Sequence, residues 1–218
     1  GEYKSVDVNG ETLFERPISQ RKMGLALKEL STSVFYKDII CGENFLVLAL
    51  IKNKCIGNLR FNTSRVFLED LEFYAKLLMN PLRCMYVPLR FYAYRKNTES
   101  ASNKPNKRNL ADSFSMCDIF DECCAYFNDG ELKKAYRYNS IMMYYWTLGT
   151  LSHAPYYKDH IKIIEDLSLT EINKKVRVWA YGTNKIFPLP IYVSPKLGIY
   201  YFRLKYKIGC ILRKLRVI

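Results

Sequence analysis

The acidic pair Glu69-Asp70 opens a stretch that ends at Leu78 and in which apolar residues repeat four positions apart, as Phe73 and Leu77 do. This spacing predicts a helix that carries carboxylates in its first turn. At that position the backbone dipole and the free N–H groups would keep a carboxylate ionised, so that it could accept a proton near neutral pH. Acidic residues in a first turn are also a routine capping arrangement. The pair is therefore a candidate for acid–base chemistry, with capping as the alternative.

The segments after this helix are expected to be short strands and a polar loop. Pro81 ends the helix, and the stretches 84–87 and 91–95 predict two strands on either side of Pro88, packed as a hairpin. The segment 96–109 has few apolar residues, so it marks a loop or a boundary.

The segments before the helix are expected to be mixed. Residues 1–17 alternate loosely and contain the turn residues Asn9-Gly10, as in a hairpin or a sheet edge. Apolar residues recur at helical spacing in 23–30 and in 47–51. Together these patterns predict an α/β fold for the first hundred residues.

The remainder of the chain is predicted to be mostly helical. Helices are expected over 110–127, 131–151 and 161–181, followed by an extended connector, 186–195, that contains three prolines. The last stretch, 196–218, has seven basic residues, no acidic residue and apolar residues at helical spacing, and it predicts a basic amphipathic helix. The expected divisions are 1–104, 105–185 and 186–218.

Several motifs around the acidic pair, taken in order, resemble the pattern of bacterial family-2 glycosyltransferases, which are inverting enzymes of the GT-A type. In that family an apolar-Arg-Phe strand, a loop, an acidic pair that opens a helix, a strand that enters a proline turn and a Tyr-x-Tyr-Arg segment follow one another. The matching residues are Leu59-Arg60-Phe61, Leu68, Glu69-Asp70, Glu72-Phe73, Tyr86-Val87-Pro88 and Tyr92-Ala93-Tyr94-Arg95, with Ser100 and Ser102 beyond.

The resemblance implies that residues 1–104 are the C-terminal, acceptor-side half of a GT-A (Rossmann-like) catalytic domain. Asp70 would then be the general base that takes the proton of the acceptor hydroxyl as this oxygen attacks the anomeric carbon, opposite the departing nucleoside diphosphate. Glu69 would orient the acceptor. A divalent metal, Mg²⁺ or Mn²⁺, and basic side chains would stabilise the diphosphate. The implied substrate-binding residues are Tyr94, Arg95, Lys96 and Ser100, with packing or solvation as the alternative for the first two.

The chain departs from the family in its donor half. The nucleotide-binding βαβ region and the Asp-x-Asp motif that carries the metal do not precede Glu69-Asp70. We expect them upstream in a longer protein, so that the fragment alone would be inactive; the alternative is a non-catalytic binding or scaffold module. Residues 44–51 are also more apolar than is usual in the family, and a histidine that sometimes follows the tyrosine segment is replaced by Arg95-Lys96.

Composition limits the location and the partners. The seven cysteines form no C-x-x-C pair, and His153 and His160 have no convincing metal-binding partners, so neither a disulfide framework nor a zinc site is indicated. A cytoplasmic protein fits this usage. Lysine and arginine exceed aspartate and glutamate by 13, which favours an anionic partner. A nucleotide-sugar donor would be such an anionic partner. The second expected substrate is a saccharide or lipid-linked acceptor.

The basic tail, 196–218, could serve three purposes. It could lie on an anionic membrane surface, pack as an ordinary helix, or contact nucleic acid. The sequence has no recognised nucleic-acid-binding signature, so a nucleic acid partner is the least favoured of the three. Attachment to the inner face of the cell membrane is the expectation that suits a lipid-linked acceptor.

Overall fold

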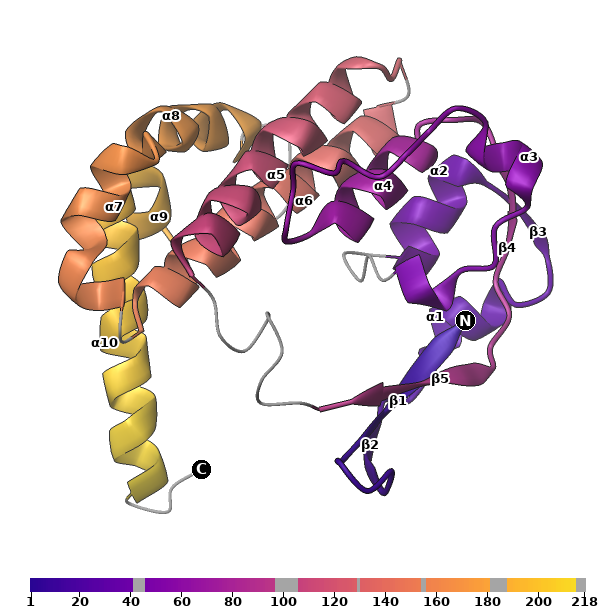
Figure 1. The fold of residues 1–218 in the computed structure, drawn as a ribbon, viewed down its shortest axis with the longest axis horizontal. Coiled ribbons are helices and arrows are strands. Elements are labelled where there is room, and N and C mark those ends of the chain that lie inside the picture. The colour runs from indigo at the N-terminus through magenta and orange to yellow at the C-terminus, as the bar shows by residue number, and fades with distance from the viewer. Residues whose placement is uncertain (41–45, 97–105, 129, 154–155, 181–187, 215–218) are drawn as a thin grey trace. The chain divides into compact units, whose positions relative to one another are not determined.

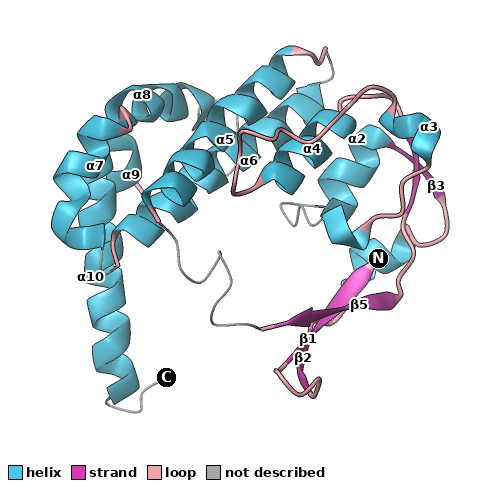
Figure 2. Cartoon of the chain, in the orientation of Figure 1, coloured by secondary structure: helices cyan, strands magenta, loops and turns pink. Residues whose placement is uncertain are grey.

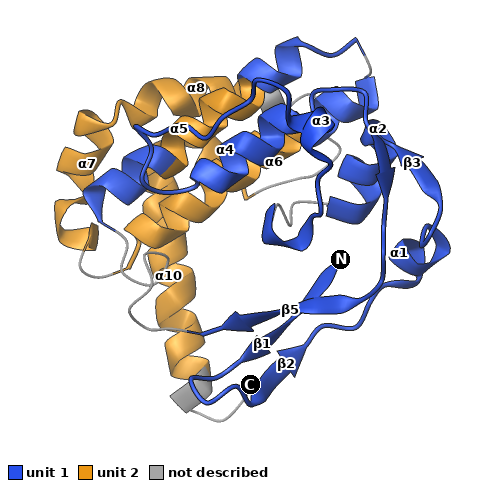
Figure 3. Cartoon of the chain, turned by 45° about the vertical axis from the view of Figure 1, so that its right-hand side comes forward, with its two compact units in different colours: residues 1–112, 122–135 blue, residues 113–121, 136–218 orange. Residues whose placement is uncertain are grey.

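The computed structural model describes residues 1–40, 46–96, 106–128, 130–153, 156–180 and 188–214 (Figure 1). The chain is mixed α/β, with its described strands before residue 97 and helices throughout the described part that follows (Figure 2). It divides into two compact units, 1–112 with 122–135 and 113–121 with 136–218 (Figure 3). The α/β class and the helical C-terminal region are thus as expected.

A three-stranded mixed sheet lies in the first unit. Strand β1 (Glu2–Val6) pairs antiparallel with β2 (Thr12–Glu15) and parallel with β5 (Arg90–Arg95), in the order β2-β1-β5. The β1–β2 turn places Gly10 at φ 91°, a backbone region that glycine occupies readily. The hairpin expected around Asn9-Gly10 is confirmed.

The hairpin expected around Pro88 is wrong. Strand β4 (Arg83–Met85) pairs antiparallel with β3 (Glu29–Ser31), whereas β5 pairs with β1, so the two segments belong to different sheets. Between them the N–H of Leu89 donates to the carbonyl of Val87, 2.8 Å away, across Pro88. Proline lacks an N–H and cannot continue a ladder, and here the chain leaves one sheet and enters the other.

Helix α4 (Glu69–Leu77) matches the predicted helix and buries Leu71, Phe73, Tyr74 and Leu77. Three other expectations in this unit are wrong. The helical spacing in 23–30 covers only the end of α1 (Gln20–Gly24) and then the start of β3, and that in 47–51 lies mostly outside the one-turn helix η2 (Leu46–Leu48). The strand expected at 59–61 is not formed. Leu27, at φ 59°, interrupts the first of these stretches, because a left-handed residue cannot continue a helix. The remaining elements are α2 (Thr32–Val34), the π-helical η1 (Phe35–Ile40) and α3 (Asn53–Ile56).

Two long helices contribute residues to both units and confirm the helices expected over 110–127 and 131–151. They are α5 (Lys107–Ala125), whose first turn is capped by the side chain of Asn106, and α6 (Gly130–Leu151). The helix expected over 161–181 is instead two helices, α7 (His160–Asp166) and α8 (Leu169–Ala180), which follow the short η3 (Tyr156–Asp159). Ser168 separates them at φ 49°, in the left-handed region.

The expected extended connector, 186–195, is wrong in the part that the structure describes. Residues 190–193 form α9 (Pro190–Val193), with proline at the start of the helix, where its missing N–H costs nothing. Ile191 is fully buried, and its carbonyl accepts a hydrogen bond of 2.6 Å from the buried side chain of Asn173. The segment is therefore part of the core of the second unit, and α10 (Pro195–Lys214) follows it directly.

No helix in the described ranges is long and apolar enough to cross a membrane.

No disulfide joins cysteines within the described ranges, and three cysteines, Cys117, Cys123 and Cys124, are buried on α5. Burial raises the pKa of the Cys123 thiol to about 12 and also raises that of Cys117. Because the thiolate is the reactive form, these thiols should resist alkylation.

We expect iodoacetamide at pH 8 to modify Cys117 and Cys123 more than about tenfold more slowly than the partly exposed Cys55. Peptide mass spectrometry after timed quenching measures the rates, and the difference should vanish in urea. Equal rates in the native protein would contradict the burial of α5.

Candidate functional site

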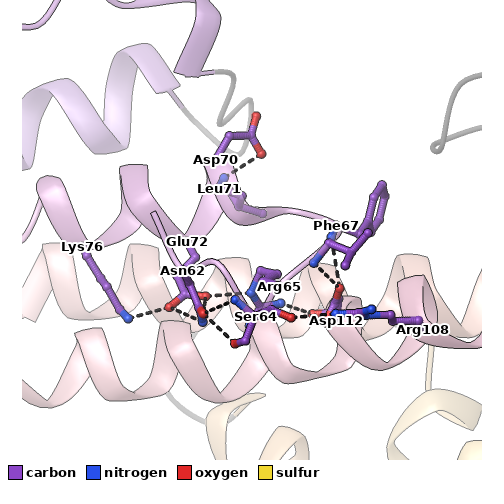
Figure 4. Close-up of polar contacts among 11 residues, drawn as sticks. Asn62, Ser64, Arg65, Phe67, Asp70, Leu71, Glu72, Lys76, Arg108 and Asp112 are labelled. Atoms are coloured by element: carbon purple, nitrogen blue, oxygen red, sulfur yellow. Dashed lines mark hydrogen bonds and ion pairs between the residues drawn. The ribbon is translucent and has the colours of Figure 1, made fainter. Parts of the chain in front are cut away.

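The segment before α4 is held against the helix by a buried ion pair. Arg65 Nε donates to the Glu72 carboxylate at 2.6 Å, and the two side chains are only 6% and 3% exposed. Lys76 Nζ also contacts Glu72, at 2.5 Å, and the amide of Asn62 lies 3.3 Å from it (Figure 4). Burial alone would raise the pKa of Glu72, but the hydrogen bonds from Lys76, Arg65 and Asn62 outweigh it and lower that pKa.

The same segment is fastened to the start of α5. The Asp112 carboxylate accepts the backbone N–H groups of Val66 and Phe67, at 3.1 and 3.0 Å. Arg65 donates to the carbonyl of Asp112 at 2.7 Å, and Arg108 donates to that of Ser64 at 2.9 Å (Figure 4). These contacts fix the backbone that leads into the acidic pair.

Leu68, the residue just before the acidic pair, has a strained backbone. Its φ of 64° and ψ of 26° lie in the left-handed region, which costs a residue with a branched side chain about 1–2 kcal/mol. No side chain caps α4 at this position. Strain of this kind persists only where the surroundings impose it, and it is frequent at functional sites. Here the contacts of Arg65 and Asp112 impose it.

Asp70 lies in the first turn of α4, partly buried and apart from the Glu72 network. Figure 4 shows its carboxylate pointing away from Glu72 and Arg65. It accepts the N–H of Leu71 at 2.8 Å. Burial raises the pKa of Asp70 above its ordinary value; the Leu71 N–H offsets part of this rise, and the nearby charge of Glu69 adds to it.

This balance differs from the simple expectation that a helix start favours the ionised carboxylate. Desolvation outweighs the backbone N–H groups, so Asp70 holds a proton more tightly than an aspartate in water does. A carboxylate with a raised pKa is a stronger base. Glu69 stands beside it, also partly exposed.

The other predicted site residues lie at the end of β5. Tyr94 and Arg95 are exposed there, and the ring of Tyr94 meets that of Tyr3 edge to face at 6.2 Å. The backbone N–H of Lys96 donates to the carbonyl of Val6 at 2.9 Å, while its side chain is exposed. Ser100 lies outside the described residues.

No hydrogen bond or ion pair within the described ranges joins the acidic pair to Tyr94, Arg95 or Lys96. The two groups are related through η2, which contacts both α4 and β5. The structure thus places the predicted residues in one unit, on two elements that share a neighbour, without bringing their side chains into direct contact.

Sequence reasoning missed the buried Arg65–Glu72 pair and the role of Asp112. Glu72 had a signal, since it falls on the apolar side of α4 between Leu71 and Phe73. Arg65 and Asp112 had none, because Arg65 lies in a loop outside any regular spacing and the contacts of Asp112 join segments 45 to 47 residues apart.

A surface hollow of about 550 Å³ lies elsewhere in the same unit. Its lining comes from β3, α2, the segment 78–83, Phe127 and Leu132, and it includes neither Glu69 nor Asp70. The two charged residues of this lining, Arg83 and Glu29, form an ion pair with each other at the surface.

The described part of the chain contains no group of three histidine, cysteine, aspartate or glutamate side chains that could hold a metal ion. His153 and His160 instead contact aromatic rings: His153 meets Tyr206 edge to face, and His160 stacks on Tyr157. Comparisons with family models, with curated proteins and with solved structures found no match to the chain.

Proposed function

We propose that this chain is the acceptor-side part of an inverting, metal-dependent glycosyltransferase, in which Asp70 is the general base. The observation that carries the proposal is the state of Asp70: a partly buried carboxylate with a raised pKa, on a helix start that buried contacts hold in a strained conformation. Such a group can take a proton from an acceptor hydroxyl near neutral pH.

The order of motifs supports the same assignment. The acidic pair opens a helix, and the Tyr-x-Tyr-Arg segment forms a strand, β5, that pairs parallel with β1. Parallel pairing needs a crossover, as in α/β domains, and a partial GT-A (Rossmann-like) domain is the form of such a fold that we propose. Family-2 membership rests on the resemblance in sequence.

The proposed division of labour follows the resemblance. Glu69 orients a saccharide or lipid-linked acceptor. Arg95, with Lys96 and the hydroxyl of Tyr94, binds the diphosphate of a nucleotide-sugar donor, and Ser100 is a further substrate-binding residue. The Mg²⁺ or Mn²⁺ ligands and the base-binding region belong to the donor half, which the resemblance places before residue 1. The metal would stabilise the charge of the departing diphosphate. Assembly of bacterial surface polysaccharide is the process in which we place this transfer.

A second candidate is a non-catalytic binding or scaffold module attached to a membrane. The exposed apolar face of α10, described below, favours it, because membrane attachment needs no donor site. The two candidates differ in one property: only the enzyme turns over a nucleotide sugar.

Turnover by the natural protein that contains this chain decides between them. We expect release of nucleoside diphosphate from a panel of nucleotide sugars with Mg²⁺ or Mn²⁺, loss of this release in excess EDTA, and a product whose anomeric configuration by NMR is opposite to that of the donor. If the folded natural protein binds no nucleotide sugar in saturation-transfer NMR, the enzyme assignment is overturned and the non-catalytic module is the remaining candidate. Retention of the anomeric configuration would exclude Asp70 as the base of an inverting transfer.

A further inference from the structure

Helix α10 packs on the rest of its unit through one face. Ile199 on this face is fully buried, and Phe202 meets the ring of Tyr145 edge to face at 4.6 Å. One turn along, the guanidinium of Arg203 lies 4.5 Å from the centre of the Tyr157 ring and donates to the carbonyl of Ser152 at 3.2 Å. These contacts fix which side of α10 faces outward.

The outward face is apolar. Leu197, Leu204, Ile208 and Ile211 fall at intervals of seven, four and three residues, a spacing that keeps them on one side of a helix. Their exposed fractions lie between 44% and 60%. From the first to the last they span about 21 Å along the axis. In Figure 1 the C-terminal part of α10 extends past the helices α7, α8 and α9 of the same unit.

Basic residues border this apolar stripe on both sides. On a helical projection Lys196 and Lys207 lie along one edge and Lys205 along the other, and all three are exposed. Lys196 also lies over the ring of Tyr200, 5.9 Å from its centre. Residues 196–218 contain no acidic side chain to neutralise these charges. An apolar stripe between two cationic edges is thus exposed to solvent.

We propose that this face of α10 binds the surface of an anionic lipid bilayer. In the bound state the helix lies in the plane of the interface, with the leucine and isoleucine side chains at the boundary of the acyl chains and the lysines at the level of the lipid phosphates. The charge argues for lipid over a protein partner, because a bilayer with anionic headgroups supplies an apolar layer and negative charge on both sides of the helix at once.

The binding attaches the protein peripherally, because α10 does not meet the requirements for a membrane-spanning helix. Anionic lipids are characteristic of the cytoplasmic leaflet, so the inner face of the cell membrane is the expected location. The inference does not rest on the proposed function, since it needs neither donor nor acceptor. It can hold if the enzyme assignment fails, and the reverse is also true.

Flotation of the 218-residue chain with vesicles tests the proposal. We expect the protein to float with vesicles made of equal parts phosphatidylcholine and phosphatidylglycerol, to float weakly with phosphatidylcholine alone, and to be released as the salt concentration rises. Equal binding to both kinds of vesicle, or to neither, would overturn it.

Variants of the stripe test the surface itself. The triple change Leu204→Ser, Ile208→Ser and Ile211→Ser should lower binding to the mixed vesicles more than about tenfold, since these side chains supply the apolar contact. A matched control changes three exposed apolar residues in the first unit, Val8→Ser, Leu50→Ser and Leu89→Ser. The control should bind as the unaltered chain does, and circular dichroism should show both variants folded. Equal losses in the two variants would overturn the assignment to α10.

The lysines require their own comparison, because any basic protein adheres weakly to anionic vesicles. Changing Lys196, Lys205 and Lys207 to Gln should weaken binding by roughly fivefold for each lysine. The control, Lys52→Gln, Lys54→Gln and Lys158→Gln, removes the same charge from exposed sites elsewhere and should bind within about twofold of the original. Equal losses of binding in the two lysine variants would mean general electrostatic attraction and would overturn the proposal. It would also be overturned if the chain bound no vesicles but formed a dimer in light scattering that the triple serine variant dissociates.

Discussion

Asp70→Asn is expected to lower kcat for sugar transfer by about 10²–10⁴-fold in the natural protein, the usual contribution of a positioned general base. Asparagine has nearly the same shape and keeps an oxygen that can accept the Leu71 N–H, but it cannot take a proton. Binding of the donor should change little, because the proposed diphosphate contacts lie on and beyond β5. Initial-rate kinetics and donor titration of the same preparation measure the two effects.

The same substitution should also stabilise the protein at neutral pH. The pKa of Asp70 is raised in the folded state, so the folded protein binds this proton more tightly than the unfolded chain does, and ionisation at neutral pH costs folding free energy. Asparagine removes that cost. The gain should be present at pH 7 and should disappear as the pH falls below about 4, where aspartate is protonated in both states. Urea unfolding at the two pH values measures it.

A purely capping role for Asp70 predicts the opposite signs. A capping carboxylate stabilises its helix, so its removal would lower stability at pH 7 and leave turnover nearly unchanged. Glu122→Gln, on the exposed side of α5, removes a carboxylate from outside the site and should alter neither property. Unchanged turnover in Asp70→Asn would exclude Asp70 as the general base. Lost turnover together with lost stability would point to damage to α4 instead of lost chemistry.

The parts of the fold that the sequence predicted correctly are those governed by local patterns. The four-residue repeat of Phe73 and Leu77 placed α4 within one residue of its observed bounds, and the Asn9-Gly10 turn identified the first hairpin. In both cases one short stretch of chain carries the whole signal. The position of Asp70 in a first turn followed from the same signal.

The predictions that failed concern elements whose partners are distant in the sequence. β4 and β5 are strands, as predicted, although β4 ends two residues before the predicted strand does. Their partners, β3 and β1, are 50 to 90 residues away, and no local pattern indicates which strand pairs with which. The apolar residues at helical spacing in α10 indicated a helix, yet the face that packs in the unit is centred on Ile199 and Phe202 and not on those residues. Periodicity identifies a face without saying what covers it.

The pKa of Asp70 could not be predicted for the same reason. Helix position alone argued for a carboxylate that ionises easily, while the observed burial shifts the balance the other way. Burial depends on how distant parts of the chain pack, and the path of the segment 62–68 that leads into α4 is itself fixed by contacts with Glu72 and Asp112. A local reading has no access to that path.

Glu72→Gln is expected to lower the free energy of unfolding by about 3–5 kcal/mol, the cost of removing one member of a buried ion pair. The change keeps the shape of the side chain but leaves the guanidinium of Arg65, which is 6% exposed, without its counter-charge. Lys76 is 39% exposed and can turn to water, so most of the cost belongs to Arg65. Denaturant unfolding at pH 7 measures it, with Glu171→Gln, an exposed helical glutamate, as the control.

The pH dependence gives an independent check with a definite sign. Since the pKa of Glu72 is lower in the folded protein, the unfolded chain takes up this proton first on acidification. The stabilisation from Glu72 is therefore complete above the ordinary glutamate value of 4.5 and is lost as the pH falls through the lower folded value. In Glu72→Gln this part of the acid dependence should be absent. An unchanged profile would contradict the assignment.

A double-mutant cycle separates the pair from the packing around it. Arg65→Met combined with Glu72→Leu replaces both charges with apolar groups of similar size, and such replacements of buried pairs are often neutral or stabilising. We therefore expect the double variant to be markedly more stable than the single variant Glu72→Leu, and the cycle with Arg65→Met to give a coupling energy of about 1–3 kcal/mol between the two positions. Additive losses would mean that Arg65 acts mainly through its bond to the Asp112 carbonyl. In that case the strained entry to α4 would depend on α5 more than on Glu72, and Asp112→Ala, which removes the acceptor of the Val66 and Phe67 N–H groups, would be the change that relaxes it.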